Sequence, residues 1–460
     1  MARLYPFRAL RYDPARVNME AVVTQPYDKI TPAMQQRYYE SSPYNLVRVI
    51  LGKHEPGDTF DGPDQNNVYT RAAEYLRNWR RDHILAEESE PAIYGYSQTY
   101  TVPGTDEIRE RRGFIALGHL YDYADKVVYR HEQTFPKHKS DRLALFKATR
   151  TYCEQIYMLY SDPAFTAEKL IFEGSFPNGF DDNPPDLAIT DEYGVVHKLW
   201  KLTDPNLINL LLTAMADKKL IIADGHHRYE TSVAYAKERG AQLKLPLNQP
   251  LDEDERISPR SLPVPAFPEA AMMMTFVNMD APGITILPTH RVVNGIENFS
   301  SPDFITKASV FYTITEIDEH APAADLIASL SQSPGDSFVA VTGDGNYILT
   351  PKPEAIAPLL KDLPTRQRQL GVAQLHAVVL DQLLGLTEDK IRATGNIQYL
   401  REAAEAVALV ESGEADIAFL IKPITLDQLR DVSLSGEVMP QKSTDFYPKL
   451  LSGLAIYALD

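Results

Sequence analysis

The sequence predicts an α+β fold of mixed α/β composition, and three observations support this prediction. Apolar and β-branched runs at residues 92–100 and 113–120 are typical of buried strands. Residues 68–81 carry apolar side chains at the spacing of an amphipathic helix. The run at residues 220–223 is followed directly by helical spacing at 229–236, which predicts a strand, a turn and a helix.

With 460 residues, 44% of them apolar, the chain is long enough to form more than one domain. We predict an N-terminal α+β domain at residues 1–125, a core domain at 126–300 and an α-rich C-terminal domain at 301–460. Six prolines and an acidic run between residues 241 and 268 interrupt regular structure. This part of the core is therefore expected to be an inserted surface loop.

Other local patterns predict individual elements. The runs at residues 46–51, 270–277 and 284–287 favour strands, and the first of these would place Arg48 on a strand. A helix is expected from about Asp141, with Ser140 as its N-cap.

The composition argues against several classes of protein. The formal charge of -17, from 46 basic and 63 acidic residues, disfavours nucleic-acid binding but allows a small anion where a few basic side chains converge. The single cysteine, Cys153, excludes an intrachain disulfide and fits a reducing compartment. We find no signal segment and no run of the roughly 18 apolar residues that a membrane-spanning helix needs. We therefore expect a cytoplasmic protein without membrane or nucleic-acid partners, and a homodimer stays an open alternative.

The turn between the predicted strand and helix, Asp224-Gly225-His226-His227-Arg228, is the strongest functional pattern in the chain. Glycine permits a positive φ and a close approach of a ligand to the backbone, and the free amides of a helix's first turn bind anions. Two imidazoles and a guanidinium add donors suited to phosphate oxygens. The alternative is a structural turn in which Asp224 caps the helix and the histidines pack. We favour a phosphate-binding turn.

Three further stretches carry basic and hydroxyl side chains. The first, from His131 to Arg142, is either part of the site or a solvated basic loop. The second is Thr289-His290-Arg291, directly after a predicted strand. The third, residues 439–449, resists helix formation and forms either a wall of the site or a packed loop. Near the front of the chain, Asp28 lies in a turn set by a proline.

Several common motifs are missing from the sequence. It contains no G-x-x-x-x-G-K-[ST], G-x-G-x-x-G or G-x-S-x-G pattern, which argues against two nucleotide-binding architectures and a hydrolase nucleophile. Cys153 has no evident activating partner. A zinc site of His226, His227 and His290 is disfavoured, because adjacent side chains in an extended turn point in different directions.

Seven separated motifs resemble, in the same order, a bacterial and archaeal family, the domain of unknown function numbered 1015. The resemblance covers nearly the whole chain. The matching motifs are Pro26-Tyr27-Asp28, Asn45-Leu46-Val47-Arg48, His131-Glu132, Asp141-Arg142, Ala223 to Tyr229, Pro288-Thr289-His290-Arg291, and the stretch from Met439 to Lys449.

The turn from Asp224 to Arg228 also resembles the phosphate-binding turn of ParB proteins, sulfiredoxins and free-serine kinases, which implies a ParB/sulfiredoxin-like core. His226 stands where sulfiredoxins have a catalytic cysteine, so their thiol chemistry is not implied. We see neither the helix-turn-helix nor the basic face of ParB proteins. The resemblance therefore implies a small-molecule kinase that transfers a phosphoryl group from pyrophosphate, or from a nucleotide, to the hydroxyl of free L-serine.

Residue types and the resemblance together suggest roles for individual residues. Asp28 is the candidate base, with His226 and His227 as further catalytic residues. Magnesium, the expected cofactor, would bind Asp224 or Glu132. The predicted phosphate-binding residues are Arg48, His131, Glu132, Lys139, Arg142, Asp224, Gly225, His226, His227, Arg228, Thr289, His290, Arg291, Lys442, Ser443 and Thr444. A phosphoserine phosphatase or phosphotransferase, and a non-catalytic nucleotide-binding regulatory module, are the alternatives.

Overall fold

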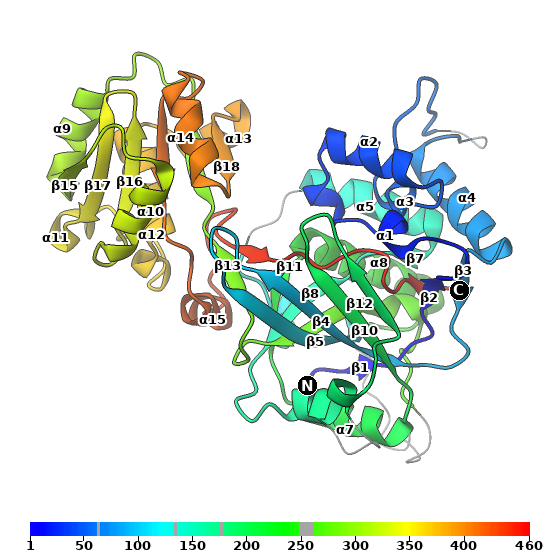
Figure 1. Cartoon of the computed structure of the whole chain (residues 1–460). Coiled ribbons are helices and arrows are strands. Elements are labelled where there is room, and N and C mark those ends of the chain that lie inside the picture. The colour runs from blue at the N-terminus through cyan, green and yellow to red at the C-terminus, as the bar shows by residue number, and fades with distance from the viewer. Residues whose placement is uncertain (62–64, 133–135, 174–178, 248–261) are drawn as a thin grey trace. The chain divides into compact units, whose positions relative to one another are not determined.

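A computed structural model gives the structure of residues 1–61, 65–132, 136–173, 179–247 and 262–460. Contacts divide the chain into two compact units, both of which can be followed in Figure 1. The first unit consists of Met1–Arg130, Thr134–Thr285 and Pro448–Asp460, and the second of His131–Gln133 and Ile286–Tyr447. The second unit is thus inserted into the sequence of the first, whereas the predicted domain boundaries fall after residues 125 and 300.

The first unit is built on a mixed β-sheet. Its hydrogen-bonded path runs through β6 (Val128–Tyr129), β11 (Leu220–Asp224), β8 (Ile156–Tyr160), β12 (Ala271–Asn278), β5 (Ile108–His119), β4 (Ile93–Thr101), β10 (Val196–Leu202) and β9 (Leu187–Thr190), with β1 (Leu4–Tyr5) also paired to β5. β8 pairs in parallel with β12 and antiparallel with β11. Every residue of β8 and β12 is buried, as expected for strands covered on both faces. The mixed α/β fold class is therefore confirmed.

Helices are stacked in layers on this sheet, as Figure 1 shows. α8 (His226–Leu243) packs on β8 and β12, α5 (Pro136–Thr149) packs on α8, and α4 (Val68–Arg81) packs on α5. Smaller elements complete the unit: α1 (Met19–Val22), η1 (Tyr27–Lys29), α2 (Pro32–Ser41), α3 (Val47–Ile50), α6 (Thr166–Glu168), α7 (Pro205–Met215), β2 (Leu10–Tyr12), β3 (Leu85–Glu87), β7 (Thr151–Tyr152) and β21 (Tyr457–Ala458). These layers cover β8 and β12, and α8 begins directly after the end of β11.

The second unit is also organised around a sheet. Its antiparallel order is β15 (Tyr312–Ile317), β17 (Gly345–Pro351), β16 (Phe338–Thr342), β19 (Ile417–Leu420), β14 (His290–Val293) and β18 (Ile397–Leu400). Side chains alternate between its two faces. Val339 and Val341 belong to a core shared with α10 (Ala323–Gln332) and α14 (Ala403–Glu411). Phe338 and Phe419 contact each other, and Phe419 also contacts Phe304 of α9 (Ser301–Phe311).

Most of the predicted elements are present in the structure. The helix expected at residues 68–81 is α4, and the strand, turn and helix after residue 219 are β11 and α8. The strands expected at residues 92–100, 113–120, 270–277 and 284–287 correspond to β4, β5, β12 and β13 (Thr285–Leu287). Of the predicted surface loop, residues 248–261 lie outside the described residues.

Two local predictions are wrong, and a sheet in the C-terminal region was not predicted. Residues 47–50 form helix α3 rather than a strand, because the side chain of Asn45 accepts a hydrogen bond of 2.9 Å from the Val47 amide and holds a helical turn. Arg48 is therefore on a helix. Ser140 is not an N-cap, since α5 begins at Pro136. The region after residue 301 contains helices, but it also contributes most strands of a sheet that the sequence did not predict.

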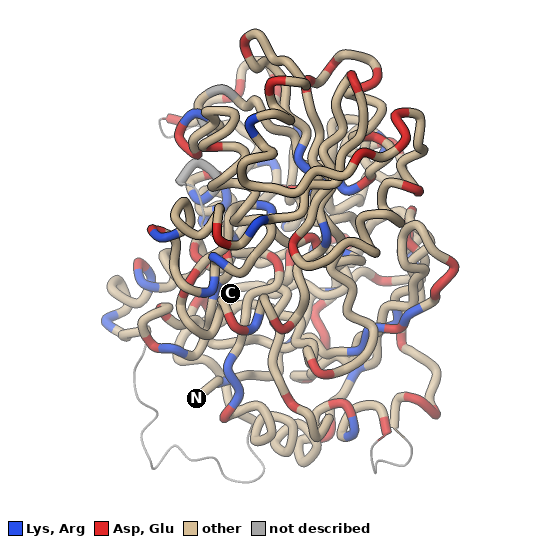
Figure 2. Tube along the Cα trace, turned by 90° about the vertical axis from the view of Figure 1, so that its left-hand side faces the viewer, with Lys and Arg blue, Asp and Glu red and all other residues tan. Residues whose placement is uncertain are grey.

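The distribution of charge bears on the classes of partner considered above. Figure 2 shows Lys and Arg interspersed with Asp and Glu along the visible trace, rather than gathered in one basic stripe. In the part of the chain that the structure describes, we find no helix with the length and apolar character needed to span a membrane.

Two glycines with similar backbone conformations provide a test of the packing of the first unit. Gly283 has a φ of +90°, and a Cβ there would lie 1.9 Å from the carbonyl oxygen of Glu110. Gly194 has a φ of +76° with no atom within 4 Å of such a Cβ. Gly194→Ala should therefore cost about 1 kcal/mol of unfolding free energy, and Gly283→Ala roughly 3 kcal/mol or more, because only the second adds a backbone clash. Urea denaturation measures both, and equal losses would contradict this packing.

Candidate functional site

The turn between β11 and α8 depends on the conformation of Gly225. Its φ is +97°, and a Cβ at this position would lie 3.0 Å from the Ile156 side chain and 3.2 Å from the Arg228 guanidinium. The first backbone bond of α8 is donated by Tyr229 to the Gly225 carbonyl, at 2.9 Å. The amides before Tyr229 lie at the positive end of an 18-residue helix that begins with the two histidines. This geometry suits an anion.

The three side chains after Gly225 differ in exposure. His226 is buried, with 7% of its surface exposed, and His227 is half-buried. Arg228 is also buried, at 4%, and donates to the Gln155 carbonyl at 2.6 Å and to the Asp224 carboxylate at 3.2 Å. Arg228 therefore holds the turn against the residue before β8 and the end of β11, and His227 is the most exposed of the three side chains.

A buried carboxylate joins this turn to α5. Glu154 lies 3.8 Å from the guanidinium of Arg228 and 3.7 Å from that of Arg142, and the side chains of all three residues are about 5% exposed or less. Burial raises the pKa of the Glu154 carboxyl, and the two guanidinium groups oppose that shift. Arg142 is one of the predicted site residues, whereas Glu154 was not predicted because no local pattern distinguishes it.

The same carboxylate fixes the turn that carries Asp28. The Tyr27 amide donates to Glu154 at 3.0 Å, and the Arg142 guanidinium lies 4.1 Å from the centre of the Tyr27 ring. Asp28 follows in η1 and is exposed to solvent. Its charge acts on Tyr27, Glu154 and Arg228. The candidate base is thus electrostatically coupled to the buried cluster formed by Glu154, Arg142 and Arg228.

Asp224, at the end of β11, is surrounded by cations. Arg228 lies 3.2 Å away and the ammonium of Lys449 lies 3.7 Å away. Burial raises the pKa of the Asp224 carboxyl, but the charges of Lys449, Arg228, Lys29 and His226 outweigh it and hold that pKa well below its usual range. Lys449 is 225 positions further along the chain, so sequence reasoning could not assign it to this site.

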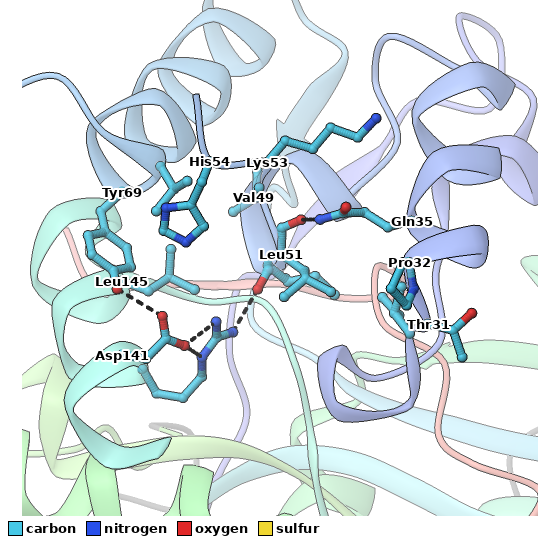
Figure 3. Close-up of a pocket in the computed structure, with 15 residues that line it drawn as sticks. Thr31, Pro32, Gln35, Val49, Leu51, Lys53, His54, Tyr69, Asp141 and Leu145 are labelled. Carbon is cyan, nitrogen blue, oxygen red and sulfur yellow. Dashed lines mark hydrogen bonds and ion pairs between the residues drawn. The ribbon is translucent and has the colours of Figure 1, made fainter. Parts of the chain in front are cut away.

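Arg142 is one of the residues that line a cavity of about 400 Å³. Figure 3 shows this cavity. It is bounded by residues of α2, α3, α4 and α5 and by the segment after α3. Asp141 accepts a hydrogen bond from the Tyr69 hydroxyl at 2.8 Å, and Arg142 donates to the Ile50 carbonyl at 2.7 Å. His54 also lines the cavity. The volume is in the range of sites for small organic molecules.

Two other predicted residues of the first unit have partners away from the turn. Lys139 forms an ion pair with Glu230, which lies one turn into α8. The guanidinium of Arg48 lies 4.3 Å from the centre of the Tyr39 ring and donates to the Tyr39 carbonyl. Lys139 is therefore close to the start of α8, whereas Arg48 contacts the ring and the carbonyl of Tyr39.

The remaining predicted residues, His131, Glu132, Thr289, His290, Arg291, Lys442, Ser443 and Thr444, belong to the second unit. Some of them form a cluster of their own. His131 lies 2.9 Å from the Thr444 hydroxyl. Arg291 is completely buried, donates to the carbonyls of Thr289 and Gln441, and lies 5.2 Å from the Tyr399 ring centre. Burial lowers the pKa of Arg291 to about 10.

Burial likewise lowers the pKa of His290 to about 4, with a further contribution from the charge of Arg291. The Nδ1 atom of His290 accepts a hydrogen bond from the Ile421 amide at 3.2 Å. His290 is thus a neutral, buried side chain of the second unit. Among the residues that the structure describes, no three His, Cys, Asp or Glu side chains are grouped closely enough to hold a metal ion.

Fold and turn together define a mixed α/β protein with a candidate anion site at a helix N-terminus. The chain belongs to the family described as "Protein of unknown function (DUF1015)", whose model matches residues 4–373. No curated protein matches the chain in sequence.

Solved structures with some likeness to the chain are distant from it. A conserved hypothetical protein from Pyrococcus furiosus is 12% identical with a TM-score of 0.33, and the match covers 74% of this chain and 92% of that one. A free serine kinase in complex with AMP is 11% identical with a TM-score of 0.33, covering 73% and 86%. SbnI with a C-terminal truncation, from Staphylococcus aureus, is 12% identical with a TM-score of 0.34, covering 74% and 85%.

The charge around Asp224 leads to a prediction about acid stability. Because the folded-state pKa of Asp224 is depressed, its stabilising contribution is present above its unfolded pKa of about 3.9 and is lost as pH falls toward the folded value. Asp224→Asn should therefore be less stable than the wild type at pH 7, and the difference should shrink as pH falls below about 4. Urea unfolding at several pH values measures it. A difference that is constant with pH would show that Asp224 is not held by these cations.

Proposed function

We propose that the first unit is a small-molecule phosphotransferase, a kinase that transfers a phosphoryl group from pyrophosphate, or from a nucleotide, to the hydroxyl of free L-serine. The observation that carries the proposal is the positive end of α8 at Gly225, with basic side chains around it and the exposed Asp28 coupled to the same cluster. Donor and acceptor identities come from the motif resemblance described above.

In the proposed reaction, the donor phosphate binds at the first amides of α8, with His226 and His227 beside it. Asp28 accepts the proton of the acceptor hydroxyl, whose oxygen forms a bond to phosphorus. The bond from phosphorus to the leaving phosphate then breaks. Such transfer is catalysed mainly by positioning and by neutralising charge on the transferred group. Glu154 and Arg228 do not react, but they fix the two turns that carry these groups.

Several predicted components remain proposals. Magnesium would neutralise and orient phosphate oxygens, and its hydrated ion commonly uses one or two carboxylates together with substrate phosphates. Asp224 fits such a role only with the substrate's own oxygens, because it is already matched by Arg228 and Lys449. The cavity beside Arg142 is large enough for an organic acceptor or part of a nucleotide. His131 and Arg291 stay candidates for anion binding in the second unit.

Phosphorus NMR on the purified full chain tests the activity. The protein is supplied with L-serine, magnesium and each of pyrophosphate, ADP and ATP in turn. A new phosphomonoester signal, dependent on both serine and one donor, supports the kinase. Release of phosphate from phosphoserine without any added acceptor selects the phosphatase instead. Donor binding without either product selects a regulatory module.

Replacement of Asp28 tests the assignment of the base. Asp28→Asn should lower turnover roughly a hundredfold, because the acceptor hydroxyl loses the group that takes its proton. Far-UV and near-UV circular dichroism should be unchanged, since Asp28 is exposed. Asp217→Asn, at a side chain 80% exposed, is the matched control and should keep wild-type turnover. Undiminished turnover in Asp28→Asn would remove Asp28 from the mechanism.

A further inference from the structure

A cavity of about 460 Å³ lies within the second unit. It is bounded by the segment between α10 and β16, the end of β17, the region of α11 (Pro353–Ile356) and α12 (Gly371–Gln374). Apolar side chains form most of its wall, among them Ile356 and Leu360, each 4% exposed. None of the sequence motifs described above contributes a residue to this wall. The volume is in the range of sites for small organic molecules.

Two polar side chains that line this cavity, Asp336 and Gln374, are hydrogen-bonded to each other. The Gln374 amide nitrogen donates to the Asp336 carboxylate at 3.3 Å and to the Arg368 carbonyl at 2.9 Å. These two acceptors fix the orientation of the amide, because an oxygen in the place of the nitrogen would face both of them. Gln374 is 7% exposed, and its Oε1 atom has no hydrogen-bond partner among the residues that the structure describes. A buried acceptor without a donor is costly, so a ligand that supplies one would be stabilised.

The Asp336 carboxylate can accept further hydrogen bonds. It is half-buried and accepts from the Gln374 side chain and the Gly371 amide, whereas an ionised carboxylate has about four acceptor positions. Burial raises the pKa of the Asp336 carboxyl, although these bonds and the charge of Lys422 oppose the shift. The Lys422 ammonium itself donates to main-chain carbonyls, and no cationic group of the described residues forms an ion pair with Asp336. A cation in the cavity would therefore be favoured beside Asp336.

These contacts could serve only to attach α12 to the segment before β16. A Cβ at Gly371 would lie 3.0 Å from the Cβ of Asp336, so the glycine does permit a close approach of the helix. Attachment explains the bonds that are made, but it leaves the Gln374 oxygen without a described donor and Asp336 without a described ion pair, both at a cavity wall. Gln374 also directly precedes a π-helix, η8 (Leu375–Leu383), and such helices are rare and frequent at functional sites. A ligand site explains both the bonds and the remaining acceptors.

We propose that this cavity binds a primary ammonium group attached to a small apolar body. Asp336 is the counter-ion, the Gln374 oxygen accepts one hydrogen bond, and the wall at Ile356 and Leu360 contacts the apolar part. An ammonium has three donors and one positive charge, which match these two acceptors. Apolar amines and amino acids with apolar side chains share this chemistry, and Arg368 in the cavity wall is a potential partner for an amino acid's carboxylate. The site belongs to the second unit and does not depend on the proposed phosphotransferase function.

Saturation-transfer NMR titrations of the full chain at pH 7 test the site with two ammonium probes, 3-methylbutylamine and L-leucine. Both carry the ammonium and a branched apolar chain, and 3-methylbutanol, which has the chain without the charge, is the control ligand. At least one ammonium probe should bind roughly tenfold or more tightly than the alcohol, as expected for charged hydrogen bonds. Tighter binding of the amine supports an amine site, and tighter binding of leucine supports an amino-acid site. No binding of either probe, or an equal affinity for the alcohol, overturns the proposal.

Replacement of Asp336 tests the counter-ion. Asp336→Asn keeps an oxygen for the Gly371 amide but loses the charge, so the affinity for the ammonium probe should fall roughly tenfold or more, toward that of the alcohol. Asp344→Asn is the matched control, because Asp344 is exposed in the turn between β16 and β17, and it should stay within about twofold of the wild type. If Asp336→Asn does not fold, Ala357→Trp replaces it, since a large side chain at this exposed wall position should reduce binding. Wild-type affinity in the folded variant contradicts the proposed site.

Discussion

The Glu154 carboxylate lies in the interior between two guanidinium groups, those of Arg142 and Arg228. Removing one partner of such a buried arrangement leaves an uncompensated charge, which is costly. Through this group, α5, the start of β8, the first turn of α8 and the Tyr27 amide are held to one another. The candidate site therefore depends on how these elements are arranged around the Glu154 carboxylate.

In this arrangement, the residues that hold the site together differ from the residues proposed to react. Glu154 and Arg228 are buried, whereas Asp28 is exposed and His227 is half-buried. A rigid buried layer that positions exposed groups reduces the reorganisation needed when a charged ligand binds. Gly225 also helps to position the turn. Its positive φ lets the chain pass from β11 into α8, and it has no side chain that would contact Ile156 or Arg228.

The sequence patterns predicted features whose residues are close together in the chain. The glycine turn at residue 225 was predicted because strand, turn and helix are adjacent in sequence. Glu154 and Lys449 were not assigned, since their partners lie tens to hundreds of positions away and no spacing reveals them. The sheet of the second unit was missed for another reason: runs such as Phe338–Thr342 are short and buried on both faces, so they lack the alternation that distinguishes a strand from a buried helical turn.

The insertion of the second unit into the sequence of the first has a consequence for synthesis. Residues 286–447 leave the ribosome before residues 448–460, which supply carbonyls for Arg111 and Gln98 in the interior of the first unit. Domains commonly fold as they emerge, but the hydrogen bonds from Arg111 and Gln98 to these carbonyls can form only after residues 448–460 have been made. The first unit is therefore completed only after the residues of the second unit have left the ribosome.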